Sequence, residues 1–300
     1  MCKVVCPACG SGETERLSCP SVSGYSYYLC KECDLVFSEP MKGASKKWYE
    51  TSEWYDVPGT PSDGLRWYES TVIQEDFVAE NKRVLNIGCG RNLFLKKLKG
   101  MKCDVTAVDI NERIIQFTKD TLGIADAHAC NILEFIRDYK EEGFDIIIGF
   151  ELLEHLESPG AFIRELKNIL KENGRIVLSV PNRERIMPSK DVWDYPPHHL
   201  TRWHPNSLRN QLESNGYIVE KMIISPLSAE DLLAVLRLYF GTKFLEDKMK
   251  SGATSPLITF GFKVLFKVRV VFYNILAVVG RNFMRTKGLN IYTVGRLIVQ

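Results

Sequence analysis

The chain has 300 residues, of which 45% are hydrophobic and 25% are charged, and its formal net charge is +2. This length predicts about two domains, and the near-balanced charge excludes a protein that binds nucleic acid through bulk electrostatics. The N-terminus has no apolar signal-peptide core, and the longest late uncharged run, Val270 to Gly280, is too short to cross a bilayer. We therefore expect a cytoplasmic protein.

Two C-x-x-C pairs, Cys6 with Cys9 and Cys30 with Cys33, stand twenty residues apart near the N-terminus. Each pair can turn two thiolates toward one ion, and four thiolates in a tetrahedron favour zinc. The polar residues between the pairs cannot form a core, so metal binding would supply the folding energy. We predict that residues 1–40 form a zinc ribbon around a structural Zn²⁺, with a redox dithiol as the alternative.

Residues 41–80 are predicted to be a linker and a leading helix. The linker is rich in aromatic side chains, among them Trp48 and Tyr49. Such side chains are expected to pack against a neighbouring domain or, as a secondary idea, to cover a ligand. Apolar residues at helical spacing from Gly64 to Glu80 predict an amphipathic helix.

The stretch VLNIGCGRN, Val84 to Asn92, is predicted to be a strand that ends in a tight turn before a helix. Gly88 and Gly90 lack a Cβ, so the turn can adopt unusual backbone angles and a ligand can lie against the main chain. A dinucleotide fold needs a small residue where this chain has Leu93. A purely structural strand-to-helix turn is the other interpretation.

A second strand is predicted from Cys103 to Val108, and Asp109 follows it. A carboxylate at the end of the second strand, about twenty residues after a glycine turn, can accept hydrogen bonds from both ribose hydroxyls. The next helix has a good N-cap in Asn111. Asp109 therefore indicates an adenosine-containing ligand.

Beyond the fourth predicted strand, Phe144 to Phe150, lies the sequence ELLEHLESPGAFIRELKNILKENGRIVLSVPN, residues 151–182. Ser158 is expected to cap a helix that has Pro159 at its first position and that ends at Gly174. Together with the glycine turn, this block resembles the class I S-adenosylmethionine (SAM) methyltransferases of small molecules. The chain departs from their motif at Asn86, where an acid is usual, and at Asn92.

The resemblance implies an α/β fold, a Rossmann-like seven-stranded methyltransferase sheet. Its SAM-binding core would span residues 81–227, with a helical insertion at 228–287 and a final strand at 288–300. The implied SAM-binding residues are Asn86, Gly88, Gly90, Asp109, Asn131, Ile132, Phe150 and Glu151. Alternating strands and helices with ligands at the strand ends agree with this fold.

Three histidines are candidates for catalysis. His198 and His199 follow Pro196 and Pro197 in a predicted loop over the strand ends, where substrates usually bind. We predict His199 as the base that removes an acceptor proton and His198 as the alternative. His155, in the turn after the fourth strand, is predicted to position other groups.

The 228–287 insertion contains two apolar stretches, and no acidic residue follows Asp247. A basic amphipathic helix is typical of proteins that bind a membrane surface. A lid or a homodimer contact is the alternative, so peripheral membrane association is left open.

We therefore expect a SAM-dependent methyltransferase that acts on a small-molecule or lipid-linked acceptor, with a sugar or quinone-like hydroxyl as the first choice. An RNA methyltransferase is one alternative, although nucleic acid is an unlikely partner because Glu151 to Glu154 replaces the signature of base-amino methylation. A non-catalytic zinc-ribbon adaptor with a degenerate SAM fold is the other.

Overall fold

A computed structural model describes residues 3–18, 24–51, 64–91, 93–185, 194–227 and 287–298 of the chain. The chain divides into two compact units, of which the first comprises Met1–Arg183, Ser189–Ile223 and Asn290–Gln300. The second comprises Glu184–Pro188 and Ile224–Leu289. Asn92 lies outside the described residues, as does the predicted 228–287 insertion apart from Lys287. The elements that form the candidate site belong to the first unit.

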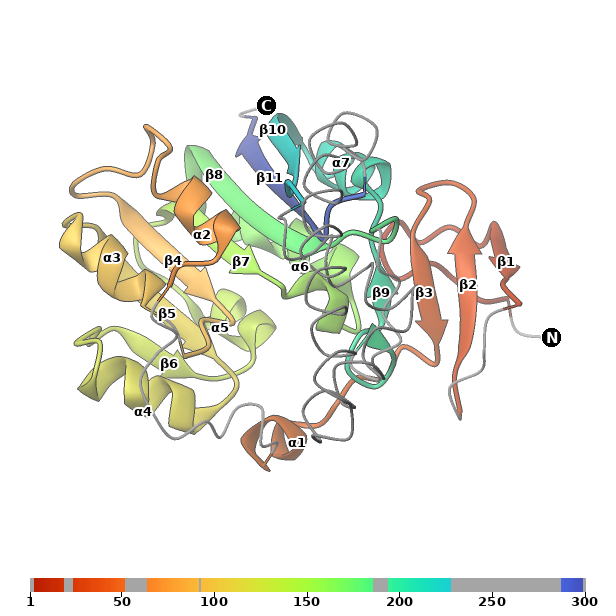
Figure 1. The fold of residues 1–300 in the computed structure, drawn as a ribbon, viewed down its shortest axis with the longest axis horizontal. Coiled ribbons are helices and arrows are strands. Elements are labelled where there is room, and N and C mark those ends of the chain that lie inside the picture. The colour runs from red at the N-terminus through yellow and green to blue at the C-terminus, as the bar shows by residue number, and fades with distance from the viewer. Residues whose placement is uncertain are drawn as a thin grey trace, which may run out of the picture. The chain divides into compact units, whose positions relative to one another are not determined.

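A seven-stranded sheet forms the core of the first unit, with the strand order β10-β11-β8-β7-β4-β5-β6 (Figure 1). The pairs β8 with β7, β7 with β4, β4 with β5 and β5 with β6 are all parallel, whereas β11 runs antiparallel to β8. The strands are β4 (Arg83–Ile87), β5 (Asp104–Asp109), β6 (Ala127–Ala129), β7 (Phe144–Phe150), β8 (Leu170–Pro181), β10 (Tyr217–Ile224) and β11 (Asn290–Leu297). The seven-stranded α/β sheet expected from the sequence is confirmed.

Alternation along the strands divides the core into two hydrophobic clusters, one on each face of the sheet. Leu85 and Ile147 belong to one cluster, whereas their neighbours Val84, Ile146 and Ile148 belong to the other. Side chains on both faces of these central strands are buried, which explains why most of their residues are apolar.

Helices cover both faces. The first cluster includes side chains of α5 (Ile132–Asp138), α6 (Pro159–Glu165) and α7 (Pro205–Glu213). The second includes side chains of α2 (Trp67–Val72), α3 (Phe94–Gly100) and α4 (Glu112–Asp120). The amphipathic helix predicted from Gly64 to Glu80 is much shorter than expected, because α2 ends at Val72. Turns follow α2, and Phe77 and Val78 still join the second cluster from them.

The helix predicted to end at Gly174 also ends earlier. It stops at Glu165, continues as the short 3-10 helix η2 (Leu166–Asn168), and β8 then begins at Leu170. Leu170 pairs with Phe144 of β7, so sheet pairing prevails over the helical pattern. A Cβ on Gly174 would lie 2.8 Å from Leu170 Cγ, so this glycine permits close packing within the strand. Ser158 is the N-cap residue of α6, but its side chain makes no capping hydrogen bond.

A smaller antiparallel sheet is formed by β1 (Thr14–Arg16), β2 (Ser26–Cys30), β3 (Val36–Glu39) and β9 (Thr201–Arg202). Three of its strands come from the N-terminal forty residues. The fourth, β9, comes from the chain after β8 and pairs with Val36 and Phe37 of β3. Cys6, Cys30 and Phe37 belong to the first hydrophobic cluster of the core. Buried residues of the N-terminal sheet therefore belong to the same hydrophobic cluster as residues of the large sheet.

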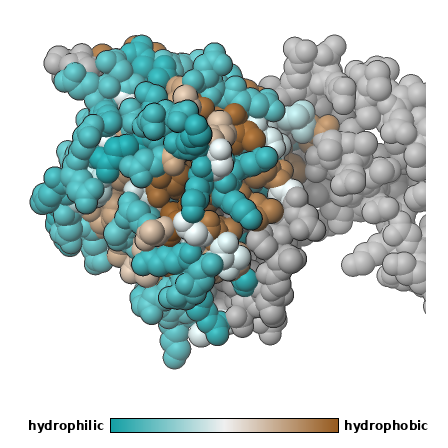
Figure 2. Space-filling model, turned by 90° about the vertical axis from the view of Figure 1, so that its left-hand side faces the viewer, coloured by the Kyte–Doolittle hydropathy of each residue, from teal (hydrophilic) through white to brown (hydrophobic). Residues whose placement is uncertain are grey.

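The face that carries α3 and α4 is mostly hydrophilic, and hydrophobic residues show between the polar ones near its centre (Figure 2). Within the described part of the chain, no helix has the length and apolarity that crossing a membrane requires.

Candidate active site

The glycine turn after β4 has the unusual backbone that the sequence predicts. Gly88 has φ of +65° and Gly90 has φ of +56°, values that residues with a Cβ rarely adopt. A Cβ on Gly88 would also lie 3.3 Å from Leu152 Cδ1. The Gly90 N–H donates to Asp109 Oδ2 at 3.1 Å, so the turn is connected to the end of the neighbouring strand.

Asp109 ends β5, and its other oxygen, Oδ1, accepts a hydrogen bond from the Asn111 N–H at 2.9 Å. Burial raises the pKa of this carboxyl group, and the backbone N–H groups oppose that rise. Asn111 caps α4 by accepting from the Arg113 N–H, which confirms its predicted capping role. Asp109 is thus oriented by backbone groups on both sides.

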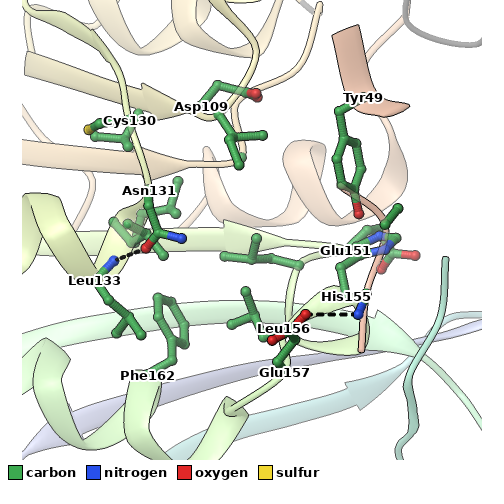
Figure 3. Close-up of a pocket in the computed structure, with 18 of the residues that line it drawn as sticks. Tyr49, Asp109, Cys130, Asn131, Leu133, Glu151, His155, Leu156, Glu157 and Phe162 are labelled. Carbon is green, nitrogen blue, oxygen red and sulfur yellow. Dashed lines mark hydrogen bonds between the residues drawn. The ribbon is translucent and has the colours of Figure 1, made fainter. Parts of the chain in front are cut away.

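A cavity of about 390 Å³ adjoins the glycine turn. Asp109 and Asn131 lie on one side of it, and Tyr49, Glu151 and His155 lie on the opposite side (Figure 3). Of the predicted cofactor residues, six line this cavity: Gly88, Gly90, Asp109, Asn131, Ile132 and Glu151. The Asn131 side chain also caps α5 by accepting from the Leu133 N–H at 2.9 Å.

The other two predicted cofactor residues, Asn86 and Phe150, line a second cavity of about 300 Å³. This cavity also contains Gly88, Gly90 and Glu151, so the two cavities share the glycine turn. All three candidate catalytic histidines line the second cavity, and His155 lines both. The glycine turn therefore borders both cavities, and the second of them contains several ionisable side chains.

Glu151 links the two cavities and has a left-handed backbone, with φ of +48°. A non-glycine residue in this region costs about 1–3 kcal/mol, so its surroundings must hold it. Its Oε1 accepts from the Ser179 hydroxyl at 2.8 Å, and its Oε2 accepts from the Asn290 amide at 2.9 Å. Burial raises the pKa of Glu151, and these hydrogen bonds oppose the rise.

His155, His198 and His199 form a compact cluster, which we call the histidine cluster. Each ring offers a nitrogen, and these three nitrogens lie within 4.8 Å of one another. The rings of His198 and His199 stack with centroids 4.7 Å apart. Imidazole nitrogens in this arrangement can take protons, and they are also common ligands of transition metals.

Hydrogen bonds orient the rings of His155 and His199. His155 Nδ1 lies 2.8 Å from the His198 carbonyl oxygen, which can only accept, so Nδ1 carries the hydrogen. His199 Nδ1 lies 3.1 Å from Asp194 Oδ1. Burial, followed by the proximity of His199 and His198, lowers the pKa of His155 well below its ordinary value. His155 is therefore neutral near pH 7.

Backbone hydrogen bonds hold the segment that carries His198 and His199 over the turn after β7. The Leu200 N–H donates to the carbonyl of Glu154, and the Leu200 carbonyl accepts from the Ser38 N–H at 2.8 Å. Glu154 and His155 belong to the 3-10 helix η1 (Leu153–His155). The histidine cluster is thus assembled from two separate segments, and the N-terminal sheet contacts one of them.

The four predicted zinc ligands come together in the N-terminal sheet. Cys6 Sγ lies 3.6 Å from Cys33 Sγ, and Cys9 Sγ lies 3.5 Å from Cys30 Sγ. Tetrahedral zinc with Zn–S bonds of about 2.3 Å requires sulfur atoms about 3.8 Å apart, so the spacing fits the ion. The contact between the two thiols lowers the pKa of Cys6 and raises the pKa of Cys33, and burial raises the pKa of Cys9. Thiolates are the form that binds metal.

Several lining residues were not predicted as site residues. Tyr49, in α1 (Lys46–Thr51), lines the first cavity, which is the arrangement expected if the aromatic linker covers a ligand. Arg66, Glu69 and Glu154 line the second cavity. Glu69 is almost fully buried and accepts from the Arg66 N–H at 2.7 Å. The one indication of Glu69 in the sequence is that this charged residue stands within the apolar pattern of the predicted helix.

Known proteins are similar in sequence to the core. A family model described as a methyltransferase domain matches residues 72–222, about half of the chain. Ubiquinone biosynthesis O-methyltransferase, mitochondrial, from Schizosaccharomyces pombe is 31% identical over 121 residues, which cover 39% of this chain and 44% of that protein. Ubiquinone biosynthesis O-methyltransferase from Glaesserella parasuis is 32% identical over 116 residues, covering 34% and 46%. The chain thus matches less than half the length of either relative.

Solved structures share the fold. A SAM-dependent methyltransferase from Archaeoglobus fulgidus superposes with a TM-score of 0.51 at 19% identity. The superposition covers 76% of this chain and 92% of that one. At this identity the likeness concerns the fold.

Proposed function

The chain belongs to the methyltransferase-domain family, and from this premise we propose that it transfers a methyl group from SAM to a hydroxyl group of a small or lipid-linked acceptor. A quinone-like ring is the first choice for the acceptor, because the curated relatives are named for ubiquinone biosynthesis. A sugar hydroxyl is the second. The RNA methyltransferase and adaptor alternatives gain no support from these relatives.

One observation supports the proposal: the glycine turn lines both a cavity whose residues fit SAM and a cavity that contains the histidine cluster. In the first cavity, Asp109 is positioned to accept hydrogen bonds from the ribose hydroxyls. Asn131 and Ile132 offer polar and backbone groups to the adenine. Gly88 and Gly90 allow the ligand to lie against the main chain.

Bound SAM supplies an electrophilic methyl group, and the protein must place the acceptor in line and help it lose a proton. We assign the proton step to the histidine cluster, with His199 as the base. Asp194 is near Nδ1 of His199 and favours the tautomer that has its lone pair on Nε2. His155 is held by the His198 carbonyl and acts as a positioning residue, and His198 is the alternative base.

We also propose that the four cysteine thiolates hold a structural zinc ion. The sulfur spacing supports this assignment, as do the turns that present each pair. The Gly10 N–H donates to the Cys6 carbonyl at 3.0 Å, and the Asp34 N–H donates to the Cys30 carbonyl at 3.0 Å. Zinc would order the N-terminal sheet and take no part in methyl transfer.

The test of the proposed function has two stages. Calorimetry first measures SAM binding to the purified protein, because this stage needs no acceptor. Release of S-adenosylhomocysteine is then measured with a panel of phenols and sugars, including ortho-dihydroxybenzenes with and without a lipid tail. Saturable methylation of one of them supports the proposal, and SAM binding without any turnover across phenols and sugars contradicts the acceptor class.

A further inference from the structure

Asp34 lies at the junction between the N-terminal sheet and the core. It follows Cys33 directly and has a left-handed backbone, with φ of +59°. Two hydrogen bonds hold its turn: the Asp34 N–H donates to the Cys30 carbonyl, and the Cys30 N–H donates to the Leu35 carbonyl at 2.9 Å. Aspartate is among the few residues that tolerate this backbone. The cysteine turn therefore fixes the backbone position from which the Asp34 side chain extends.

Its carboxylate binds the Arg183 side chain in the core. Arg183 Nη2 lies 2.9 Å from both Asp34 oxygens, and Arg183 Nη1 donates to the Asp34 main-chain carbonyl at 2.6 Å. The Arg183 side chain is only 21% exposed. A guanidinium with several hydrogen bonds to one residue fixes direction as well as distance, which a lysine cannot do.

Arg183 lies just after β8, and the catalytic candidates lie in a later segment, of which the structure describes residues 194–204. The far end of that segment pairs with the N-terminal sheet through Thr201 and Arg202. Arg183 meets this end where its N–H donates to the Trp203 carbonyl at 2.8 Å. His204 Nδ1 also lies 3.2 Å from Asp34 Oδ2, but it accepts from the Asn206 N–H, so this contact carries less weight.

We propose that Asp34 is a positioning residue for the acceptor side of the active site, acting through Arg183 to hold the base of the segment that presents His198 and His199. The inference rests on the proposed function for the role of the histidines. The N-terminal sheet would then set the position of the histidine cluster against the glycine turn. No contact between Asp34 and the acceptor is required.

The test compares Asp34→Asn with the matched control Glu13→Gln. Asparagine tolerates the left-handed backbone and keeps the shape of the side chain, but the variant loses the charge and replaces one acceptor oxygen with an NH2 donor. Glu13 is an exposed carboxylate of the same region that pairs with Lys3. Arg183→Lys is the reciprocal variant, because it keeps the charge and loses the planar fork.

The first readout is native-state hydrogen exchange, which needs neither SAM nor acceptor. We expect the Leu200 amide, which is bonded to the Glu154 carbonyl, to exchange about tenfold faster in Asp34→Asn, as a charge-assisted hydrogen bond weakens. The Leu85 amide in β4 and the metal content should not change. Unchanged exchange at Leu200 would overturn the inference, whatever the enzyme acts on.

The second readout uses the methyltransferase reaction. In Asp34→Asn and Arg183→Lys we expect kcat for the acceptor to fall about tenfold while SAM affinity stays constant. The double variant should be no worse than either single variant, because both remove the same interaction. A loss of SAM affinity equal to the loss of kcat would show a general structural effect and would also contradict the inference.

Discussion

The two sides of the glycine turn are built in different ways. The cofactor side consists of residues that follow directly after neighbouring parallel strands: Gly88 after β4, Asp109 at the end of β5 and Asn131 after β6. The acceptor side joins the turn after β7 to a segment more than forty residues later, which the N-terminal sheet also contacts. The first side therefore depends on local backbone geometry and the second on long-range packing.

The largest expected effect tests whether the acceptor side depends on the N-terminal sheet. In Cys33→Ser we expect loss of about one zinc ion per chain, because three thiolates bind zinc far less well than four. The purified protein is checked by elemental analysis, with the buried Cys103→Ser as the control outside the cluster. We also expect faster amide exchange at Leu200. Retention of zinc in Cys33→Ser would refute the assignment of the ligands.

The next effect concerns the histidine cluster. His199→Ala should lower kcat by about 10²–10⁴, the usual contribution of acid–base catalysis, and leave SAM affinity intact. His128→Ala is the control, because His128 is exposed and bonds to Asp126 away from both cavities. Steady-state rates across pH 6 to 9 measure the change. If kcat stays at the wild-type value throughout, transfer proceeds by proximity and His199 has no part in proton removal.

A smaller effect is expected on the cofactor side. Asp109→Ala removes an acceptor for two ribose hydroxyls and should weaken SAM binding by about 2–4 kcal/mol. The control is Asp104→Ala, at the exposed start of the same strand. Calorimetry gives both affinities. Equal SAM affinity in Asp109→Ala and the wild type would show that the ribose lies elsewhere.

The smallest effect concerns the turn itself. Gly88→Ala forces a side chain into a left-handed backbone and brings its Cβ to 3.3 Å from Leu152 Cδ1. We expect the free energy of unfolding to fall by about 1–2 kcal/mol, with weaker SAM binding. Denaturant unfolding with and without SAM measures both. The control is Gly100→Ala in α3, where a Cβ would meet open space and helix propensity favours alanine.

The contrast between the two sides also explains how much could be predicted from the sequence. Asp109 and the glycines were identifiable because strand ends in a parallel sheet meet at one edge, so their proximity follows from the order of elements. The bounds of β7 could be read from its apolar residues. The helix end predicted at Gly174 was wrong, because the pairing of Leu170 with Phe144 is a tertiary contact that has no local signature.

The acceptor side could be predicted only as separate residues. His155 and His199 were recognised as candidates, yet nothing local shows that their rings lie 4.8 Å apart. The sequence does not show that β9 joins the N-terminal sheet. Its two residues are too few to show the alternation that is typical of a strand. Arg66 and Glu69 were missed for a related reason, since their place in a cavity depends on how α2 packs on the sheet.

The fourth strand of the N-terminal sheet has a consequence for engineering. Residues 1–40 resemble a module that could be cut out or exchanged, but β3 pairs with β9, which follows β8 within the core sequence. A fragment without the core would leave β3 with an open edge, which is a known route to aggregation. A core without the fragment would leave Thr201 and Arg202 without their strand partners. Circular permutation that keeps both pieces should therefore be tolerated better than deletion of either one.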